Sequence, residues 1–356
     1  MPASAADTPA RTSAAVATWR ARLPGLAAAV ALALVATAVG TALPMVGGPV
    51  SGVVLGVLVG AFLRRRPRTR TALGPGLRVA SKLVLQIAVV LLGARLSLAQ
   101  VAEVGLDSLP VMLGTVVVCL AGAAVLGRLL GIDGELRALI GTGTAICGAS
   151  AIAAVTPVLR ASSTNVAYAL STVFAFNIAA VLLFPPLGQL LGMSEEAFGL
   201  FAGTAVNDTS SVVAAATTYG PVAADYAVVV KLVRTLLIIP IVVGLAVLVA
   251  RRDRRSAGEA GAVRSRPSVL RLVPWFLVGF LILATANSLG AVPDSWHGPL
   301  ATAATFLITV ALTAIGLSTD LPALRAAGLR PLAFGGMLWV LVTGSALAIM
   351  AATGML

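Results

Sequence analysis

The sequence predicts an all-α polytopic membrane protein. Hydrophobic residues make up 59% of the chain and charged residues 11%, and the mean hydropathy is +1.02. A soluble domain is nearer half apolar and a quarter charged. The apolar stretches are about 20 residues long, which is the length of a membrane-spanning helix, and they lack the alternation of transmembrane strands.

Eleven transmembrane helices are predicted from these stretches. The polar segment 1–21 is expected to be disordered, and the run at 22–42 is long for a signal peptide, although Ala36-Thr37-Ala38 resembles a cleavage site. We therefore expect 22–42 to be retained as a first helix. The predicted spans are 22–42, 46–63, 77–98, 110–130, 138–158, 166–191, 197–219, 225–250, 269–289, 300–318 and 330–354.

The arginines predict the orientation of these spans. Runs of arginine occupy 64–70 and 251–271, and six predicted spans separate them, so both lie on one side. The loops at 99–109 and 290–299 lie on the other side and contain no Lys or Arg. The positive-inside rule then predicts a cytoplasmic N-terminus and an external C-terminus. The net charge of +12 is thereby explained by topology and by contact with anionic lipid, and no nucleic-acid partner is expected.

The two lysines of the chain suggest an internal duplication. Lys82 and Lys231 each open a Lys-Leu-Val tripeptide inside an apolar stretch. Without the first span, the remaining ten form two sets of five, 46–192 and 197–354. An odd number of spans per set gives an inverted repeat, with a substrate site expected near the midplane. A charge within a span usually faces a cavity or a substrate path, although either lysine could snorkel to the surface.

A first candidate for a broken helix is the stretch 141–154, which is rich in Gly, Thr and Ser. Glycine weakens a helix interior and permits close approach of a ligand. A break near Gly148 would expose free N–H groups and a positive helix end, where Ser150 adds a hydroxyl donor. This pattern predicts an anion site, and close packing of small residues is the alternative. Thr144 and Ala149 belong to the same candidate site.

The stretch 202–215 is a second polar segment, and it contains Asp208, an acidic residue near the middle of a predicted span. A carboxylate there must find a partner or bind a proton. We expect it to pair with Lys231 or Arg234, either as a coupling group or as a structural ion pair. Asn207 supplies a neighbouring amide.

Two further polar residues are candidates for the site. Asn177 lies in an apolar span, where it could line the site or form a helix–helix hydrogen bond. Thr313 lies on 300–318, the span that the repeat pairs with 138–158. The following residues, Asp320 and Pro322, are expected to form a cap or turn.

Several classes of function are not expected. His297 is the one histidine, and Cys119 and Cys147 lack a metal-binding spacing, so neither a metal site nor another cofactor is predicted. The motifs HExxH and GxSxG are absent, and the chain is not expected to be an enzyme.

The motifs together resemble a known family. The stretches 147–154, 203–208 and 314–321 resemble the YeiH-type bacterial family, which is labelled as sulfate exporters, and the likeness runs from about residue 25 to the C-terminus. The family is similar to bile-acid sodium symporters and cation–proton antiporters. The resemblance implies two inverted five-helix repeats, a panel and a core domain, location in the bacterial inner membrane, and a homodimer through the panel. It also implies that 138–158 and 300–318 are broken crossing helices.

One departure from the sodium-coupled relatives matters. Those relatives surround the crossing with acidic and amide ligands, and neither 138–158 nor 300–318 contains any, so sodium coupling is not expected.

The sequence therefore predicts a secondary transporter, an exporter of a small anion such as sulfate, sulfite or a sulfonate. The alternative is a cation–proton antiporter in which Asp208 carries the proton. The predicted substrate-binding residues are Thr144, Gly148, Ala149, Ser150, Asn177, Asn207, Lys231, Lys82 and Thr313. The predicted coupling residues are Asp208, Lys231 and Arg234.

Overall fold

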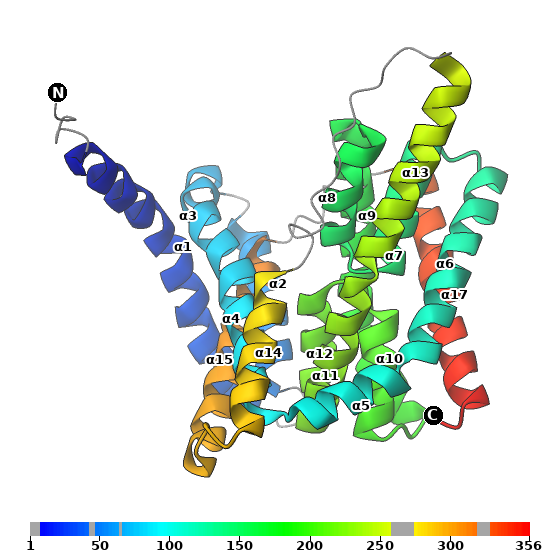
Figure 1. The fold of residues 1–356 in the computed structure, drawn as a ribbon. Coiled ribbons are helices and arrows are strands. Elements are labelled where there is room, and N and C mark those ends of the chain that lie inside the picture. The colour runs from blue at the N-terminus through cyan, green and yellow to red at the C-terminus, as the bar shows by residue number, and fades with distance from the viewer. Residues whose placement is uncertain (1–7, 43–46, 64–65, 258–273, 319–327) are drawn as a thin grey trace, which may run out of the picture. The chain divides into compact units, whose positions relative to one another are not determined.

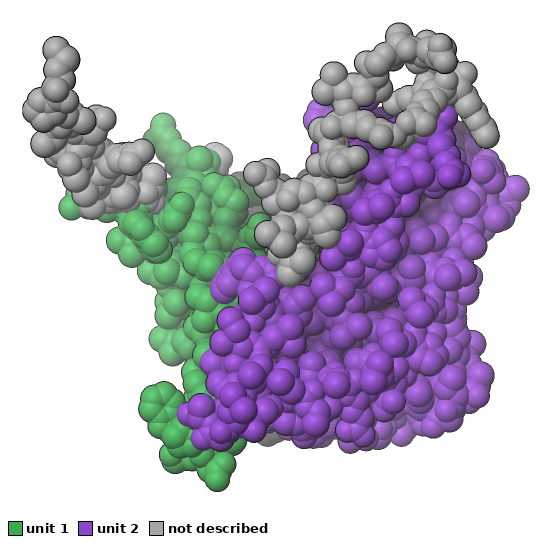
Figure 2. Space-filling model, in the orientation of Figure 1, with its two compact units in different colours: residues 1–92, 292–319 green, residues 93–291, 320–356 purple. Residues whose placement is uncertain are grey.

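Helices joined by short turns and breaks form the residues that the computed structural model describes, namely 8–42, 47–63, 66–257, 274–318 and 328–356 (Figure 1). The chain divides into two compact units (Figure 2). Unit 1 contains residues 1–92 and 292–319, and unit 2 contains residues 93–291 and 320–356.

Seven helices in the described residues are long and apolar enough to cross a membrane, which makes the chain a multi-pass membrane protein. They are Trp19–Ala42, Arg68–Arg95, Leu109–Leu129, Ser163–Leu190, Pro221–Val249, Asp294–Ser318 and Leu329–Ala352. The other four predicted spans fall on two shorter apolar helices and on two interrupted helices. Neither the count of eleven spans nor the inverted repeat is confirmed.

The described residues of unit 1 form six helical elements. The first helix begins at Thr8, within the segment predicted to be disordered. Residues 1–7 lie outside the described residues. The elements are α1 (Thr8–Ala42), α2 (Gly47–Leu63), α3 (Pro67–Val79), the π-helical η1 (Ala80–Val84), α4 (Leu85–Leu92) and α15 (Asp294–Ser318).

A stripe of glycines lets α2 lie directly against α15. Gly48, Gly52, Gly56 and Gly60 recur every fourth residue and therefore share one face of α2. A Cβ atom at Gly56 would lie 2.6 Å from the Thr313 carbonyl oxygen and 3.0 Å from the Gly316 Cα. Small residues at such spacing are a common means of packing helices within a membrane.

Gly56→Leu is expected to lower the free energy of unfolding by about 1–3 kcal/mol, because backbone atoms of α15 occupy the space that the new side chain needs. Thermal unfolding in detergent measures the change. Gly244→Leu is the matched control, since a Cβ at Gly244 would meet no heavy atom within 4 Å. Equal stability of the two variants would contradict direct contact between the helices.

The prediction that 300–318 is a broken helix is wrong. α15 runs without interruption from Asp294 to Ser318. The hydroxyl groups of Thr309 and Thr313 donate to carbonyl oxygens one turn earlier in the same helix, at 2.9 and 2.7 Å. They therefore add to the hydrogen bonding of the helix and supply no partner for a break. Asp320 and Pro322 lie outside the described residues.

Unit 2 contains the remaining helices. α12 packs along α10 and α11, α9 contacts both α7 and α11, and α6 packs between α7 and α17. The elements are η2 (Gly93–Arg95), α5 (Leu98–Asp107), α6 (Leu109–Leu129), α7 (Gly134–Ala145), α8 (Ala149–Leu159), α9 (Ser163–Leu190), α10 (Glu195–Ala205), α11 (Thr209–Tyr219), α12 (Pro221–Leu236), α13 (Ile238–Ala257), α14 (Trp275–Ser288) and α17 (Leu329–Ala352).

Candidate functional site

Two interrupted helices of unit 2 break at equivalent points. α7 ends at Ala145 and α8 begins at Ala149, while α10 ends at Ala205 and α11 begins at Thr209. The ends of α7 and α10 are 60 residues apart, and so are the starts of α8 and α11. The predicted break near Gly148 is present, and the second break lies at 206–208 rather than in 300–318.

The sequences around the two breaks are also similar. Gly143-Thr144-Ala145 recurs as Gly203-Thr204-Ala205 at the same offset of 60 residues, and Ser150 corresponds to Ser210. The Gly148 position corresponds to Asp208. This similarity is visible in the sequence, although the pairing of the two lysines, which lie 149 residues apart, aligns different segments.

Lys231 joins the two breaks. Its Nζ donates to the carbonyl oxygens of Ile146 at 2.8 Å and Val206 at 2.9 Å, two residues that occupy corresponding positions just after α7 and α10. The side chain is fully buried. Carbonyl groups at a helix C-terminus carry partial negative charge, so an ammonium group there stabilises both helix ends at once.

Arg234, one turn further along α12, binds the end of α7 alone. Its Nε donates to the Ala145 carbonyl at 3.0 Å and its Nη2 lies 3.5 Å from the Thr144 carbonyl. The side chain is fully buried, and Nη1 has no partner among the described residues. Two adjacent buried cations therefore neutralise the negative ends of the interrupted helices.

Asp208 does not form the predicted pair. Among the described residues, no ion pair within 4.0 Å joins it to Lys231 or Arg234. Its Oδ2 instead accepts hydrogen bonds from the Ser210 backbone N–H at 3.1 Å and from the Ser210 hydroxyl. The carboxylate is thus the N-cap of α11, because the free N–H groups of its own helix lie nearest to it.

Asn177 reaches both breaks from α9. Its Oδ1 accepts from the backbone N–H groups of Asn207 at 3.3 Å and Asp208 at 3.4 Å. Its Nδ2 has no partner among the described residues and lies 3.8 Å from where a Cβ on Gly148 would be. The residue is 2% exposed, and a buried amide donor without a partner requires an explanation.

The N-terminus of α8 has no side-chain cap. Gly148 precedes it with φ 65° and ψ −122°, a conformation that favours glycine, and as the N-cap residue Gly148 has no side chain that could bond to the first turn. Ala149 is half-buried and Ser150 is exposed. Side chains do cap the neighbouring helices α7, α9, α10 and α11, namely Asp133, Ser162, Ser194 and Asp208.

The comparisons with known proteins agree with this membrane architecture. The chain matches the family described as "Conserved hypothetical protein 698" over residues 24–335. The chain belongs to the UPF0324 (YeiH) family. It is 42% identical to a UPF0324 membrane protein of Streptococcus pyogenes serotype M3 over 337 residues, which covers 94% of this chain and 98% of the relative.

A UPF0324 membrane protein of Clostridium tetani is 39% identical over 278 residues, 76% of this chain and 81% of the relative. A relative from Streptococcus pneumoniae serotype 4 is 40% identical over 278 residues, 76% of this chain and 80% of the relative. No solved structure matches the chain. The resemblance to the YeiH-type family is therefore confirmed.

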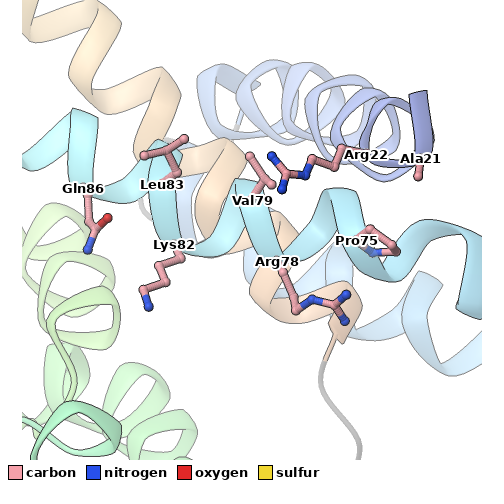
Figure 3. A pocket seen from close by; sticks show the side chains of 8 residues that line it. All are labelled: Ala21, Arg22, Pro75, Arg78, Val79, Lys82, Leu83 and Gln86. Carbon is pink, nitrogen blue, oxygen red and sulfur yellow. The ribbon is translucent and has the colours of Figure 1, made fainter. Parts of the chain in front are cut away.

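Most of the predicted site residues of this UPF0324 protein gather around the two breaks in unit 2. Lys82 and Thr313 belong to unit 1. Lys82 is exposed on η1, where it lines a groove with Arg22 and Arg78 (Figure 3), and Thr313 is buried against the glycine stripe of α2. The residues at the breaks are Thr144, Gly148, Ala149, Ser150, Asn177, Asn207, Asp208, Lys231 and Arg234.

Proposed function

We propose that this UPF0324 protein is a secondary transporter, most simply an exporter, of a small anion such as sulfate, sulfite or a sulfonate. The observation that carries the proposal is the correspondence of Gly148 with Asp208. At α11 the positive helix end holds the chain's own carboxylate, and at α8 the corresponding position is a glycine with no side chain. An anion from solution would take the place of that missing carboxylate.

The donors around Gly148 suit a compact oxyanion. The backbone N–H groups of Ala149 and Ser150 open the first turn of α8, and the Ser150 hydroxyl adds a rotatable donor. The unpartnered Nδ2 of Asn177 supplies another from α9. Several N–H and O–H donors around a helix N-terminus bind the oxygens of a sulfur oxyanion without a counter-ion.

The role of Lys231 favours transport that does not need sodium. In a broken helix, the exposed carbonyl ends are the groups that coordinate a transported or coupling cation. Here the Lys231 ammonium holds the carbonyls of Ile146 and Val206. We therefore propose that this ammonium stands where a coupling sodium ion would otherwise bind, and we expect anion binding to be independent of Na⁺.

A cation–proton antiporter is the second candidate function. The observations in its favour are the carboxylate of Asp208 at a break and the unpartnered Oδ1 of the buried Asn207, since both are acceptors that a cation would use. To bind there, a cation would have to displace the hydrogen bonds that Ser210 donates to the Asp208 carboxylate. Positive charge on Lys231 and Arg234 nearby would oppose this function.

Thermal unfolding of the purified protein with added sulfate, sulfite, taurine or sodium chloride tests the proposal. Wild type should be stabilised by a sulfur oxyanion or a sulfonate, and Lys231→Ala should lose that stabilisation. A shift that appears with sodium alone and disappears in Asp208→Asn would contradict the anion proposal and support the antiporter.

Asp208→Asn is expected to have opposite effects under the two functions, a gain of anion binding or a loss of cation transport. For an anion site, removal of a negative charge beside Gly148 should tighten anion binding by about 10-fold, because like charges a few ångströms apart repel strongly in a partly buried site. It should also change the pH dependence of binding. For an antiporter, the same variant should abolish cation-stimulated fluorescence dequenching in vesicles. Unchanged binding and unchanged pH dependence would remove Asp208 from any coupling role.

The membrane location, orientation and oligomeric state of this transporter are also proposals. We propose a bacterial inner-membrane location with a cytoplasmic N-terminus and an external C-terminus, on the basis of the arginine-rich segments 64–70 and 251–271. Alternating access would move a core against a panel, and a homodimer would form through the panel. We propose transport rather than catalysis, with the small anion and the bilayer as partners.

A further inference from the structure

A basic groove lies beside the crossing of α1 and α3 in unit 1. Gly25 and Gly76 meet at this crossing, where a Cβ on Gly76 would collide with the Arg22 carbonyl oxygen. Beyond this contact the helices leave a groove of about 480 Å³. Figure 3 shows Arg78 and Lys82 extending from the same side of one helix and Arg22 projecting from α1. The groove is lined by Ala21, Arg22, Pro75, Arg78, Val79, Lys82, Leu83 and Gln86.

The charged side chains of this region are all positive. Residues 8–92 contain nine arginines, one lysine and no Asp or Glu. Among the described residues, Arg22, Arg78 and Lys82 form no ion pair, in contrast to Arg95 of unit 2, which lies 3.4 Å from Asp225. Three cations without an ion pair around one groove give it a positive potential that attracts anions.

The groove also changes character along its length. Near Arg22, which lines one end of the groove, Trp19 is 52% exposed, and the Arg22 guanidinium lies 5.4 Å from its ring centroid. Exposed tryptophan and arginine side chains are typical of the headgroup level of a bilayer. At the other end Leu83, on the membrane-capable helix Arg68–Arg95, is 40% exposed, as expected of a side chain that faces acyl chains.

We propose that the groove binds the headgroup of an anionic phospholipid. Positive charge from Arg22, Arg78 and Lys82 would hold the phosphate, and Val79 and Leu83 would contact the start of an acyl chain. The apolar half of the groove favours a lipid over a free phosphate or sulfate ion, which would leave those side chains without a partner. This site is separate from the proposed anion site at the α8 N-terminus and does not depend on transport.

Titration of the full-length protein in neutral detergent with phosphatidylglycerol, phosphatidylcholine or inorganic phosphate tests the proposal, with thermal stability as the readout. Phosphatidylglycerol should stabilise wild type, and the other two should not. The triple variant Arg22→Gln, Arg78→Gln, Lys82→Gln should bind phosphatidylglycerol at least about 10-fold more weakly, since each basic residue near an anionic surface adds appreciably to binding.

A triple variant of equal charge provides the control. Arg128, Arg251 and Arg330 are exposed residues of unit 2, and their replacement by Gln should leave the response to phosphatidylglycerol unchanged. If both triple variants bind phosphatidylglycerol equally weakly, the binding depends on the net charge of the protein and not on the groove, and the proposal is overturned. Stabilisation by inorganic phosphate, lost in the groove variant alone, would overturn it in favour of a site for a small anion. Lys82→Gln alone, a change at an exposed position, should still show a partial loss.

Discussion

Lys231→Met is expected to abolish anion binding and to lower the free energy of unfolding by about 2–6 kcal/mol. Methionine has a similar length but cannot donate a hydrogen bond, so the carbonyl groups of Ile146 and Val206 would be left without a donor in a fully buried position. Each such unsatisfied group costs roughly 1–3 kcal/mol. Because the same ammonium group binds both helix ends, its loss would release both breaks, and the donors at the α8 N-terminus would lose their alignment.

The chain offers a closely matched control for this variant. Lys82 opens the same Lys-Leu-Val tripeptide, but it is exposed on η1. Lys82→Met should change the free energy of unfolding by less than about 0.5 kcal/mol, as expected of a surface substitution. Chemical unfolding in detergent and anion titration measure both variants. A Lys231→Met protein that binds sulfate or taurine like wild type would exclude any role for Lys231 in the site.

A rescue experiment distinguishes a cation requirement from a packing requirement. Lys231→Ala should leave space beside the carbonyls of Ile146 and Val206, and methylammonium ions added to this variant should restore part of the anion response. Sodium ions should restore it as well if the ammonium stands where a coupling cation would bind. Loss of function that neither ion relieves would contradict that assignment.

The sequence allowed a correct prediction of the helical membrane class and of one helix break. The glycines and hydroxyl residues around Gly148 carry that prediction, because few large side chains remain to stabilise the helix there. The second break is expected in 300–318, because the resemblance implies a broken crossing helix there and the inverted repeat pairs this span with 138–158. That repeat rests on helix count and charge placement, to which the two lysine tripeptides add a weaker match, and the structure gives these lysines different environments, since Lys231 is fully buried and Lys82 is exposed.

The environment of Asp208 could not have been derived from the sequence. Composition makes Lys231 and Arg234 its obvious partners, since all three are charged residues in apolar stretches. The structure instead satisfies each charge with backbone groups: both cations bind C-terminal carbonyls, and the carboxylate binds an N-terminal N–H group. A sequence pattern records side chains, and the free backbone groups appear only when the position of the break is known.

Gly148→Ala is expected to lower anion affinity at least about 10-fold and the free energy of unfolding by about 1–3 kcal/mol. At φ 65° and ψ −122° an alanine is strained. Its methyl group would also enter the space beside the break, 3.3 Å from Val173 Cγ1 and 3.8 Å from the unpartnered Asn177 Nδ2. The methyl group would thus displace an anion from the amide donor that we assign to it.

Gly131→Ala distinguishes the effect of backbone strain from the effect of filling the proposed anion site. Gly131 has φ 63°, close to that of Gly148, but a Cβ there would meet no heavy atom within 4 Å. This variant should lose about 1 kcal/mol of stability and bind anions like wild type. Calorimetric titration with sulfate or a sulfonate, combined with thermal unfolding, gives both quantities for each variant. If the two alanine variants bind the anion equally well, the space beside Gly148 is not the binding site. If Gly148→Ala alone loses affinity, the open end of α8 is the position where the anion takes the role that Asp208 has at α11.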